Sequence, residues 1–394
     1  MKVNSKTRNI QTRRELFDFL QSQMQTAYRE LREKQRLEFE SSLVKSYIFE
    51  VDLPVDLSDS RKKQDRLKTF IEEVFGSGRN GNSQLTVEAK EEDGFYELNL
   101  SSREQELILY LDTMTNPRFW QGFSISSSQP LDVWLATIAK TRSEFDFVWL
   151  WPSFLEAIQK RGLPRGFGLD YDYRKFEDGD SDTTTYLKMQ LWGGSDTAEL
   201  YNLLKENPQF YDKVVLSKVR LKEFGDSNKE MFALQDLKYI GKFTTRGTDF
   251  STHVATLSFV RSEYEKKIRS IENTYALRWK ETEHGGTVLE GFAIHFIPNG
   301  FELPVQRLTE RILDGTTPFR LLGFTSAQND SSAVAEVVDL HTGGELSFEI
   351  YPDLVSVYLP ENTCGNTIAR IYTNLQHFFN GRFTVEADNG DQLF

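Results

Sequence analysis

The chain has 394 residues, a formal net charge of −12 and 39% apolar residues, including 30 Phe. This length predicts two or three domains, and the apolar and aromatic content argues against global disorder. The acidic balance argues against a surface that is attracted as a whole to nucleic acid or to an anionic membrane.

Cysteine usage and hydropathy limit the chemistry and the compartment. The single cysteine, Cys364, excludes an intramolecular disulfide and a cysteine cluster around a metal. No apolar run approaches the ~18 residues that a membrane span needs, and residues 1–14 are polar and basic without an apolar signal core. The sequence therefore predicts an intracellular, cytoplasmic protein without a membrane contact.

Residues 1–46 predict a helical, basic N-terminal arm. Thr12 and Glu15 have the spacing of a capping box at its start. Four apolar residues at helical spacing form one stripe and are candidate oligomerisation residues: Leu20, Met24, Ala27 and Leu31. The stripe could dock on a second copy or a partner, or it could pack on the chain's own first domain. The basic N-terminus is also where nucleic-acid binding stays open.

Residues 47–141 predict a first α+β unit, because runs with the period of a strand alternate with runs of helical spacing. The expected elements are a strand at 47–53, a helix at 65–75, strands at 85–89, 95–100, 107–112 and 119–125, and a closing helix at 131–139.

Residues 142–182 are interpreted as an aromatic and acidic connector between domains. Trp and Tyr dominate binding energies at protein interfaces, so five such residues in or near the connector are candidate binding anchors: Trp149, Trp151, Tyr171, Tyr173 and Trp192. The same side chains could instead fill a contact between two domains. The acidic run at 178–182 lacks the glycine and the bidentate glutamate of a calcium loop, and it is interpreted as a linker.

Residues 183–280 and 281–394 predict two more units of the same plan. In the second unit, strands are expected at 184–191, 214–224, 232–243 and 253–260, with a helix ending at Lys205 and a closing helix that includes Tyr264 and Tyr275. In the third, a strand at 288–297 and a helix at 302–313 precede strands near 319–326, 333–340 and 346–359 and a closing helix near 363–379.

The predicted fold class is α+β, with three tandem β-α-β3/4-α units after a long N-terminal helix. Each unit would be an antiparallel, curved sheet covered by helices. By analogy alone, the order resembles the curved sheets of the TATA-box-binding-protein and helix-grip classes. No motif of either class is present, so no site residue is carried over.

The sequence offers no local catalytic or metal motif. Its five histidines include no pair at zinc spacing, and it contains no G-x-S-x-G elbow, Walker lysine or dinucleotide fingerprint. No catalytic residue, metal site or cofactor is predicted. Asp56, Glu88 and Lys90 could build a metal-dependent phosphoesterase or nuclease, although Glu-x-Lys is common on solvent-facing strands.

The leading hypothesis is a non-enzymatic intracellular binding or scaffold protein that acts through protein–protein recognition or self-association. One alternative is a small-ligand sensor with a pocket between a curved sheet and its covering helix. The other is the metal-dependent phosphoesterase or nuclease.

Overall fold

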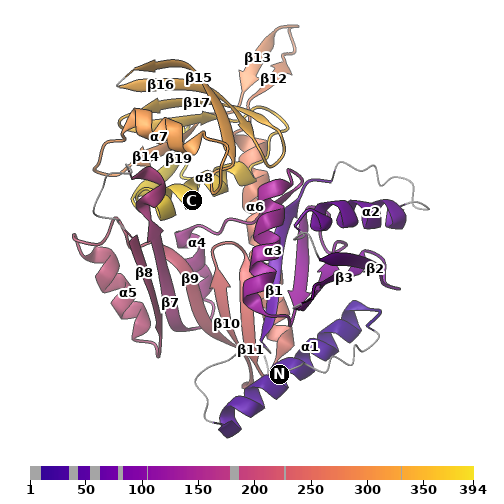
Figure 1. The fold of residues 1–394 in the computed structure, drawn as a ribbon. Helices are drawn as coiled ribbons and strands as arrows, with labels where there is room; N and C mark the ends of the chain where they lie inside the picture. The colour runs from indigo at the N-terminus through magenta and orange to yellow at the C-terminus, as the bar shows by residue number, and fades with distance from the viewer. Residues whose placement is uncertain are drawn as a thin grey trace. The chain divides into compact units, whose positions relative to one another are not determined.

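The structure, a computed structural model, describes residues 10–34, 43–53, 63–78, 83–103, 105–177, 186–225, 228–329 and 331–394. The chain forms two compact units. The first comprises Met1–Phe147, Lys222–Leu237 and Gly241–Arg261, and the second comprises Val148–Leu221, Lys238–Ile240 and Ser262–Phe394. Both units combine helices with antiparallel strands, which confirms the predicted α+β class (Figure 1).

The first unit contains a sheet with the strand order β2-β3-β4-β5-β1-β11-β10, and β6 also pairs with β1. Its elements are α1 (Arg13–Lys34), β1 (Val44–Val51), α2 (Lys63–Gly76), β2 (Gln84–Ala89), β3 (Phe95–Ser101), β4 (Glu106–Asp112), β5 (Phe119–Ser124), α3 (Ser128–Thr141), β6 (Phe145–Phe147), most of β10 (Asn228–Lys238), β11 (Lys242–Gly247) and the first part of α6 (Phe250–Thr274).

Helices cover both faces of this sheet around β1. On one face, Phe145 packs against Phe49 of β1 and Phe75 of α2, with ring centroids 4.9 and 5.6 Å apart. On the other face, Phe17 of α1 contacts Phe123 and Phe250 at 5.6 and 5.5 Å. As a result, every residue of β1 is buried, as expected for a strand covered on both sides.

The capping box at the start of α1 is confirmed. The backbone N–H of Glu15 donates to Thr12 Oγ1 at 3.2 Å, and the N–H of Thr12 donates back to Glu15 Oε2 at 3.1 Å. The apolar stripe of α1 lies against β1 and β11 of the same unit, where Leu20, Met24 and Ala27 are buried. These contacts place the stripe on the chain's own sheet.

The second unit contains a six-stranded sheet, strands that pair in the order β9-β7-β8, and a separate hairpin of β12 and β13. Its elements are α4 (Pro152–Gln159), β7 (Leu163–Asp172), the 3-10 helix η1 (Tyr173–Phe176), β8 (Tyr186–Trp192), α5 (Thr197–Glu206), the first part of β9 (Leu216–Gly225), β12 (Arg278–Glu281), β13 (Thr287–Glu290), β14 (Ile294–Pro298), α7 (Val305–Ile312), β15 (Leu321–Asn329), β16 (Ser332–Asp339), β17 (Glu345–Tyr351), β18 (Leu354–Tyr358), α8 (Asn366–Phe378) and β19 (Phe383–Ala387).

Two of the three predicted units share one strand order. The six-stranded sheet has the order β15-β16-β17-β18-β14-β19, and the sheet of the first unit has the order β2-β3-β4-β5-β1 with β6 beside β1. The middle segment differs, because β7 lies between β8 and β9. Three tandem units like those of the TATA-box-binding protein are therefore not confirmed, and the predicted domain boundaries stay a prediction.

Several expected elements were wrong. The strands expected at 232–243 and 346–359 are each two neighbouring strands, β10 with β11 and β17 with β18. Residues 253–260 form the first turns of α6 instead of a strand, because the buried residues Phe250, His253, Leu257 and Val260 follow helical spacing. Residues 288–297 form two strands, separated by Gly291 with φ +109°. The glycine-containing part of the predicted connector forms β7, a strand of ten residues.

A buried ion pair joins α8 to the six-stranded sheet. Asp339 at the end of β16 accepts hydrogen bonds from the guanidinium of Arg370 and the hydroxyl of Thr367, both on α8. It also accepts the backbone N–H of His341 at 2.9 Å. Arg370 is fully buried, so this carboxylate compensates a charge that has no access to water.

Candidate functional site: the open face of the six-stranded sheet

One face of the six-stranded sheet is acidic and is called the open face here. On the opposite face, alternate residues of the strands are buried toward α7 and α8. None of the six strands contains Lys or Arg. Four glutamates alternate with the buried residues and so belong to the open face: Glu336, Glu345, Glu349 and Glu386. Such a face favours neutral or cationic partners.

β15 is an edge strand of this sheet, and its second half is unpaired on the outer side. The first half is covered, because the N–H of Gly323 donates to the carbonyl of Leu313 at 3.1 Å. Within the described part of the chain, nothing pairs with the outer side of Phe324–Asn329. This stretch has no charge and no proline, and Phe324 is 68% exposed. Edge strands of this kind accept an added strand.

His295 lies between Ser356 and Asp388 on the open face. Ser356 Oγ is 3.0 Å from His295 Nδ1, and Asp388 Oδ1 is 2.6 Å from His295 Nε2. Strand pairing sets this geometry, because His295 of β14 stands directly opposite Ser356 of β18, and Asp388 follows β19 on the other side of β14. The second oxygen of Asp388 accepts the N–H of Ala293 at 3.2 Å, which fixes the carboxylate.

The hydrogen bonds define the protonation of the neutral histidine. Asp388 is an acceptor, so Nε2 of His295 carries the proton and Nδ1 accepts the hydroxyl of Ser356. The His295 side chain is 18% exposed and the Asp388 side chain 56%, whereas Ser356 is buried between its neighbours. Tyr358 lies on β18 together with Ser356. Burial and the neighbouring Glu349 of β17 raise the pKa of Tyr358, so its hydroxyl stays protonated.

A second serine–histidine pair lies in the core of the first unit. Ser46 Oγ is 2.8 Å from His253 Nε2, and His253 Nδ1 is 2.7 Å from Gln235 Oε1. The amide of Gln235 donates to Glu223 at 2.6 Å. Burial lowers the pKa of His253 to about 3, which keeps the ring neutral. This network satisfies buried polar groups and has no access to a substrate.

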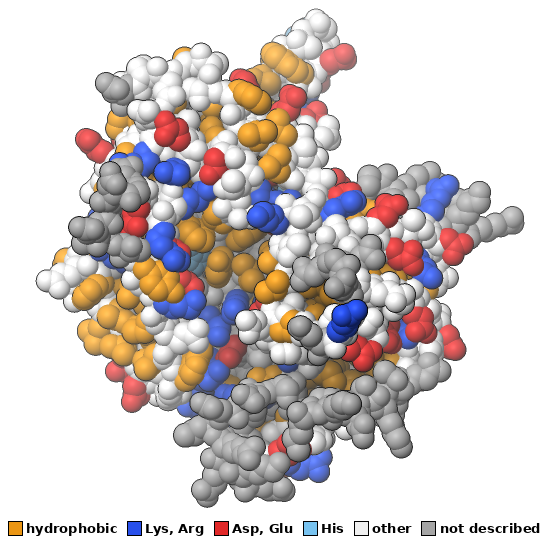
Figure 2. Space-filling model, in the orientation of Figure 1, with side chains coloured by type: hydrophobic (Ala, Val, Ile, Leu, Met, Phe, Trp, Pro, Cys, Tyr) orange, Lys and Arg blue, Asp and Glu red, His pale blue; other side chains and the backbone are white. Residues whose placement is uncertain are grey.

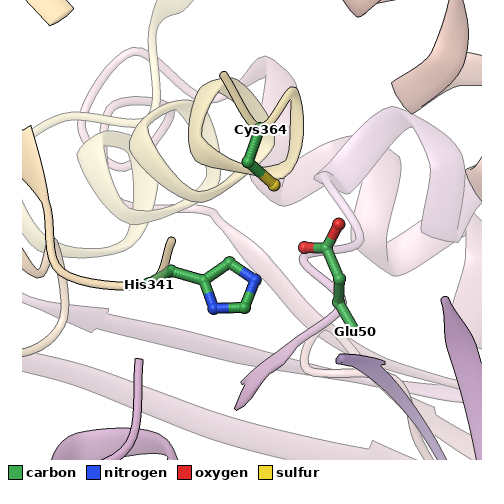
Figure 3. A group of neighbouring side chains, drawn as sticks. All are labelled: Glu50, His341 and Cys364. Atoms are coloured by element: carbon green, nitrogen blue, oxygen red, sulfur yellow. The ribbon is translucent and has the colours of Figure 1, made fainter. Parts of the chain in front are cut away.

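A histidine and a cysteine lie close together in the second unit (Figure 3). A ring nitrogen of His341 and Sγ of Cys364 are within 4.8 Å of each other, and both residues are buried. These atoms are preferred zinc ligands, but two donors are fewer than the three or four of a zinc site. Figure 3 also draws Glu50, which belongs to the first unit and accepts a hydrogen bond from Arg118 Nε at 2.7 Å.

Three of the five candidate anchors are buried: Trp149, Trp151 and Tyr171. The backbone N–H of Trp149 donates to the hydroxyl of Tyr264 at 2.9 Å, and the hydroxyl of Tyr171 donates to the carbonyl of Phe379 at 2.7 Å. Trp151 packs on Phe154, with ring centroids 5.0 Å apart. These contacts lie within the second unit, whereas the sequence had left open a contact between two domains, so the role of the anchors stays a prediction.

The other two anchors, Tyr173 and Trp192, are half-buried. Trp192 stacks with the guanidinium of Arg220, 3.9 Å from the ring centroid. Trp192 ends β8, and Figure 2 shows apolar side chains gathered over β8 and α5, where Tyr186, Leu200 and Leu203 are exposed. Tyr173 and Trp192 stay predicted anchors.

The oligomerisation role of the α1 stripe also stays a prediction. Leu20, Met24 and Ala27 are already covered by their own sheet, and the side chain of Leu31 lies outside the described residues. A second copy would have to displace these contacts in order to use the stripe.

The proposed phosphoesterase residues are engaged with each other. Lys90 Nζ is 3.1 Å from Glu88 Oε1 and 2.8 Å from Glu97 Oε2, while Asp56 lies outside the described residues. Glu88 and Glu97 stand opposite each other on β2 and β3, so Lys90 neutralises a repulsive pair. This arrangement favours a structural role for Glu88 and Lys90.

The first unit has a groove of about 640 Å³ between α3 and the tip of the β3–β4 hairpin. Its apolar residues are Leu100, Leu107, Pro130, Val133 and Trp134. Among the described residues, its polar rim consists of serine, threonine and glutamine side chains and the charged Arg103. The volume is typical of small-molecule sites.

The three residues of this site, His295, Ser356 and Asp388, were not predicted from the sequence. They are far apart in the chain: His295 and Ser356 are separated by 61 residues, and His295 and Asp388 by 93. The alternation of polar and apolar residues in the two strands could have indicated the site. His295 and Ser356 both occupy polar positions between apolar residues of their strands.

The protein is thus of the α+β class and has two sheets of the same strand order. The six-stranded sheet has an open, acidic face, whereas the sheet of the first unit is covered on both faces around β1. The chain belongs to the family of MJECL33-like proteins, which it matches over residues 4–394. It is similar to the uncharacterized protein MJECL33 of Methanocaldococcus jannaschii, with 23% identity over 422 aligned residues that cover 98% of this chain and 96% of the relative. No helix among the described residues is long and apolar enough to cross a membrane.

Proposed function

We propose that this protein is a binding protein whose second unit adds a basic, extended segment of a partner protein to the edge of β15. The observation that carries the proposal is the uncharged, unpaired edge Phe324–Asn329 beside the acidic open face. Backbone groups of the edge supply affinity, and the acidic face selects the charge of the partner.

Backbone N–H groups of successive residues in a strand point to opposite sides, and this alternation identifies the donor that such a partner needs. Gly323 directs its N–H away from β16, toward Leu313. Two residues on, the N–H of Thr325 lies on the same outer side of the strand. Phe324 supplies an exposed ring beside it, and aromatic side chains contribute strongly to interfaces.

Thr325→Pro tests the proposal directly, since it removes that outer donor and leaves the ladder with β16 intact. Proline is tolerated at such edge positions. Peptides selected on the immobilised full chain from a display library should be rich in Lys and Arg. We expect Thr325→Pro to weaken their binding at least about tenfold, the equivalent of one or two hydrogen bonds.

Val133→Asp, in the groove of the first unit, is the matched control and should bind the same peptides unchanged. Equal affinity of the wild type and a folded Thr325→Pro variant would contradict the proposal. A second copy of the chain is the other occupant to test. If β15 pairs with itself, sedimentation velocity shows a dimer that Thr325→Pro dissociates.

The groove in the first unit supports a second candidate, a small-ligand sensor. Its apolar floor, with Arg103 as the cation among the described rim residues, suits an apolar molecule with one anionic group. Native mass spectrometry of the purified protein should then show a retained mass of a few hundred daltons (about the size of a drug-like ligand). Val133→Asp should remove that mass, whereas Thr325→Pro should retain it.

A further inference from the structure

We propose that Ser356 is a nucleophile activated by His295 and positioned by Asp388, which gives the open face a slow acyl-transfer activity toward activated esters that carry no negative charge. This activity goes beyond strand recognition by β15. It also departs from the non-enzymatic role that the sequence favoured.

The geometry contains the three groups that this chemistry needs: a nucleophile, a base in contact with it and a group that orients the base. Ser356 Oγ is 3.0 Å from Nδ1 of His295, and the carboxylate of Asp388 is 2.6 Å from Nε2. Asp388 holds the proton of the neutral ring on Nε2. The lone pair on Nδ1 is therefore directed at the hydroxyl of Ser356 and can take its proton.

The reaction needs no co-reactant other than water. Ser356 Oγ attacks the acyl carbon, and its proton passes to Nδ1 of His295. The bond from Oγ to the acyl carbon forms, the bond from that carbon to the leaving oxygen breaks, and the proton on His295 passes to the leaving alkoxide or to solvent. Water then attacks the acyl-serine with His295 as base, which releases the carboxylic acid and returns a proton to Oγ.

The surroundings of Ser356 define the class of substrate. β18 lies in ladders with both β17 and β14, so its amides are used in strand pairing rather than in stabilising an oxyanion. The reaction is therefore slow and needs a good leaving group, such as a nitrophenolate. Glu349 stands opposite Ser356 and Glu386 opposite His295, and these carboxylates disfavour anionic esters.

The chain provides two serines as internal controls. Ser46 contacts His253 at 2.8 Å, but both residues are fully buried in the first unit. Ser347 on β17 is half-buried on the open face, but its hydroxyl donates to Glu336 at 2.7 Å and contacts a carboxylate instead of a histidine. Ser356 itself is 3% exposed, but of the three serines it is the one whose histidine partner, His295, has a side chain that is 18% exposed on the open face.

A neutral fluorophosphonate tests the proposal on the full chain. Ser356 Oγ would form a bond to phosphorus as fluoride leaves, with the serine proton taken by His295. Intact mass and peptide mapping measure the rate at each serine. We expect label on Ser356 above Ser46 and Ser347, none on Ser356→Ala, and a rate about 10²–10⁴-fold lower in His295→Gln, the usual effect of a lost general base.

Asp388 requires its own test, because it acts through His295. Asp388→Asn should slow the labelling of Ser356, and Asp388→Glu should restore part of the rate, a recovery that depends on the carboxylate. A rate at Ser356 equal to that at Ser347, or an unchanged rate in a folded His295→Gln variant, would overturn the proposal. If His295→Gln does not fold, as judged by its thermal midpoint, Asp388→Asn decides. The label needs no partner strand, so its outcome is independent of binding at β15.

Discussion

The sheet of residues 44–147 and the sheet of residues 294–387 have the same strand order, but their central strands differ. β1 is buried at every residue, whereas β14 alternates between buried and half-buried residues. In the first unit, α1 and the first part of α6 cover the second face, and in the second unit that face is open. The comparison indicates that a sheet with this strand order needs helices on one face only. Its second face is then available for a partner.

The two serine–histidine pairs also differ in whether the face of the sheet on which they lie is covered. Around Ser46 and His253 the second face is sealed, and burial lowers the pKa of the histidine to about 3. Around Ser356 and His295 the face is open, and an exposed carboxylate, Asp388, orients the ring. The same contact is a core hydrogen bond in one unit and a candidate nucleophile in the other.

The largest effect on the free energy of unfolding is expected between each sheet and the helices that cover it. In the first unit the side chains there are aromatic, whereas in the second unit they include the Asp339–Arg370 ion pair. Asp339→Ala leaves Arg370 buried without its counterion, so we expect a loss of about 3–5 kcal/mol in the free energy of unfolding. Urea unfolding measures it. Glu345→Ala on the open face is the control, and its free energy of unfolding should stay within about 0.5 kcal/mol of the wild-type value. A loss below about 1 kcal/mol for Asp339→Ala would show that the pair is dispensable.

The second prediction removes part of the cover that distinguishes the first unit. Leu20 of α1 is fully buried on the sheet. Leu20→Ala should therefore lower the free energy of unfolding by about 2–5 kcal/mol through lost burial and a cavity. Leu322→Ala, on the exposed side of β15, is the matched leucine change and should have a much smaller effect. Equal effects in urea unfolding would mean that α1 is not a structural cover of its own sheet.

The third prediction uses pH to separate the two histidines. His253 has a pKa of about 3 in the folded protein and 6.5 as its ordinary value. Between these values the unfolded chain binds a proton that the folded protein does not. The free energy of unfolding therefore falls as the pH drops below 6.5, by about 2 kcal/mol at pH 5. Below about pH 3 both forms are protonated and the loss stops growing.

Urea unfolding of the wild type and His253→Gln at pH 7 and pH 5 measures this contribution. The variant should lack the dependence that belongs to His253. Burial also lowers the pKa of His377, to about 4, but this residue is present in both proteins and cancels in the comparison. An identical pH dependence in the two proteins would contradict a neutral, buried His253.

Much of the fold could be predicted, because strand alternation and helical spacing are local. Most elements of both repeated sheets were found in this way, but β6 and β19 were not expected, and β17 and β18 were expected as one strand. The start of α6 was missed, since Thr252, Val254 and Thr256 have strand propensity while its helix depends on tertiary burial. Asp249, which accepts the N–H groups of Ser251 and Thr252 at 3.1 and 3.3 Å, was the missed cap.

The candidate site could not be predicted in the same way. His295, Ser356 and Asp388 meet through the pairing of β14 with β18 and β19, and this register depends on residues far apart in the chain. Likewise, the open edge of β15 exists because the strand order places it last, which its sequence alone does not reveal.

The smallest effect on stability is expected at the two counterpart edge strands, β2 and β15. Glu88 on β2 is 62% exposed and paired with Lys90, whereas β15 has no charge at all. Charges at an edge prevent association with other strands. Glu88→Thr should change the free energy of unfolding by less than about 0.5 kcal/mol, because Glu88 is exposed and the buried Lys90 keeps its 2.8 Å contact with Glu97. It should nevertheless cause concentration-dependent association in sedimentation velocity, since β2 would then be as uncharged as β15. If Glu88→Thr sediments like the wild type at every concentration, charge does not distinguish the two edges, and the case for β15 would rest on Phe324 and the unpaired backbone alone.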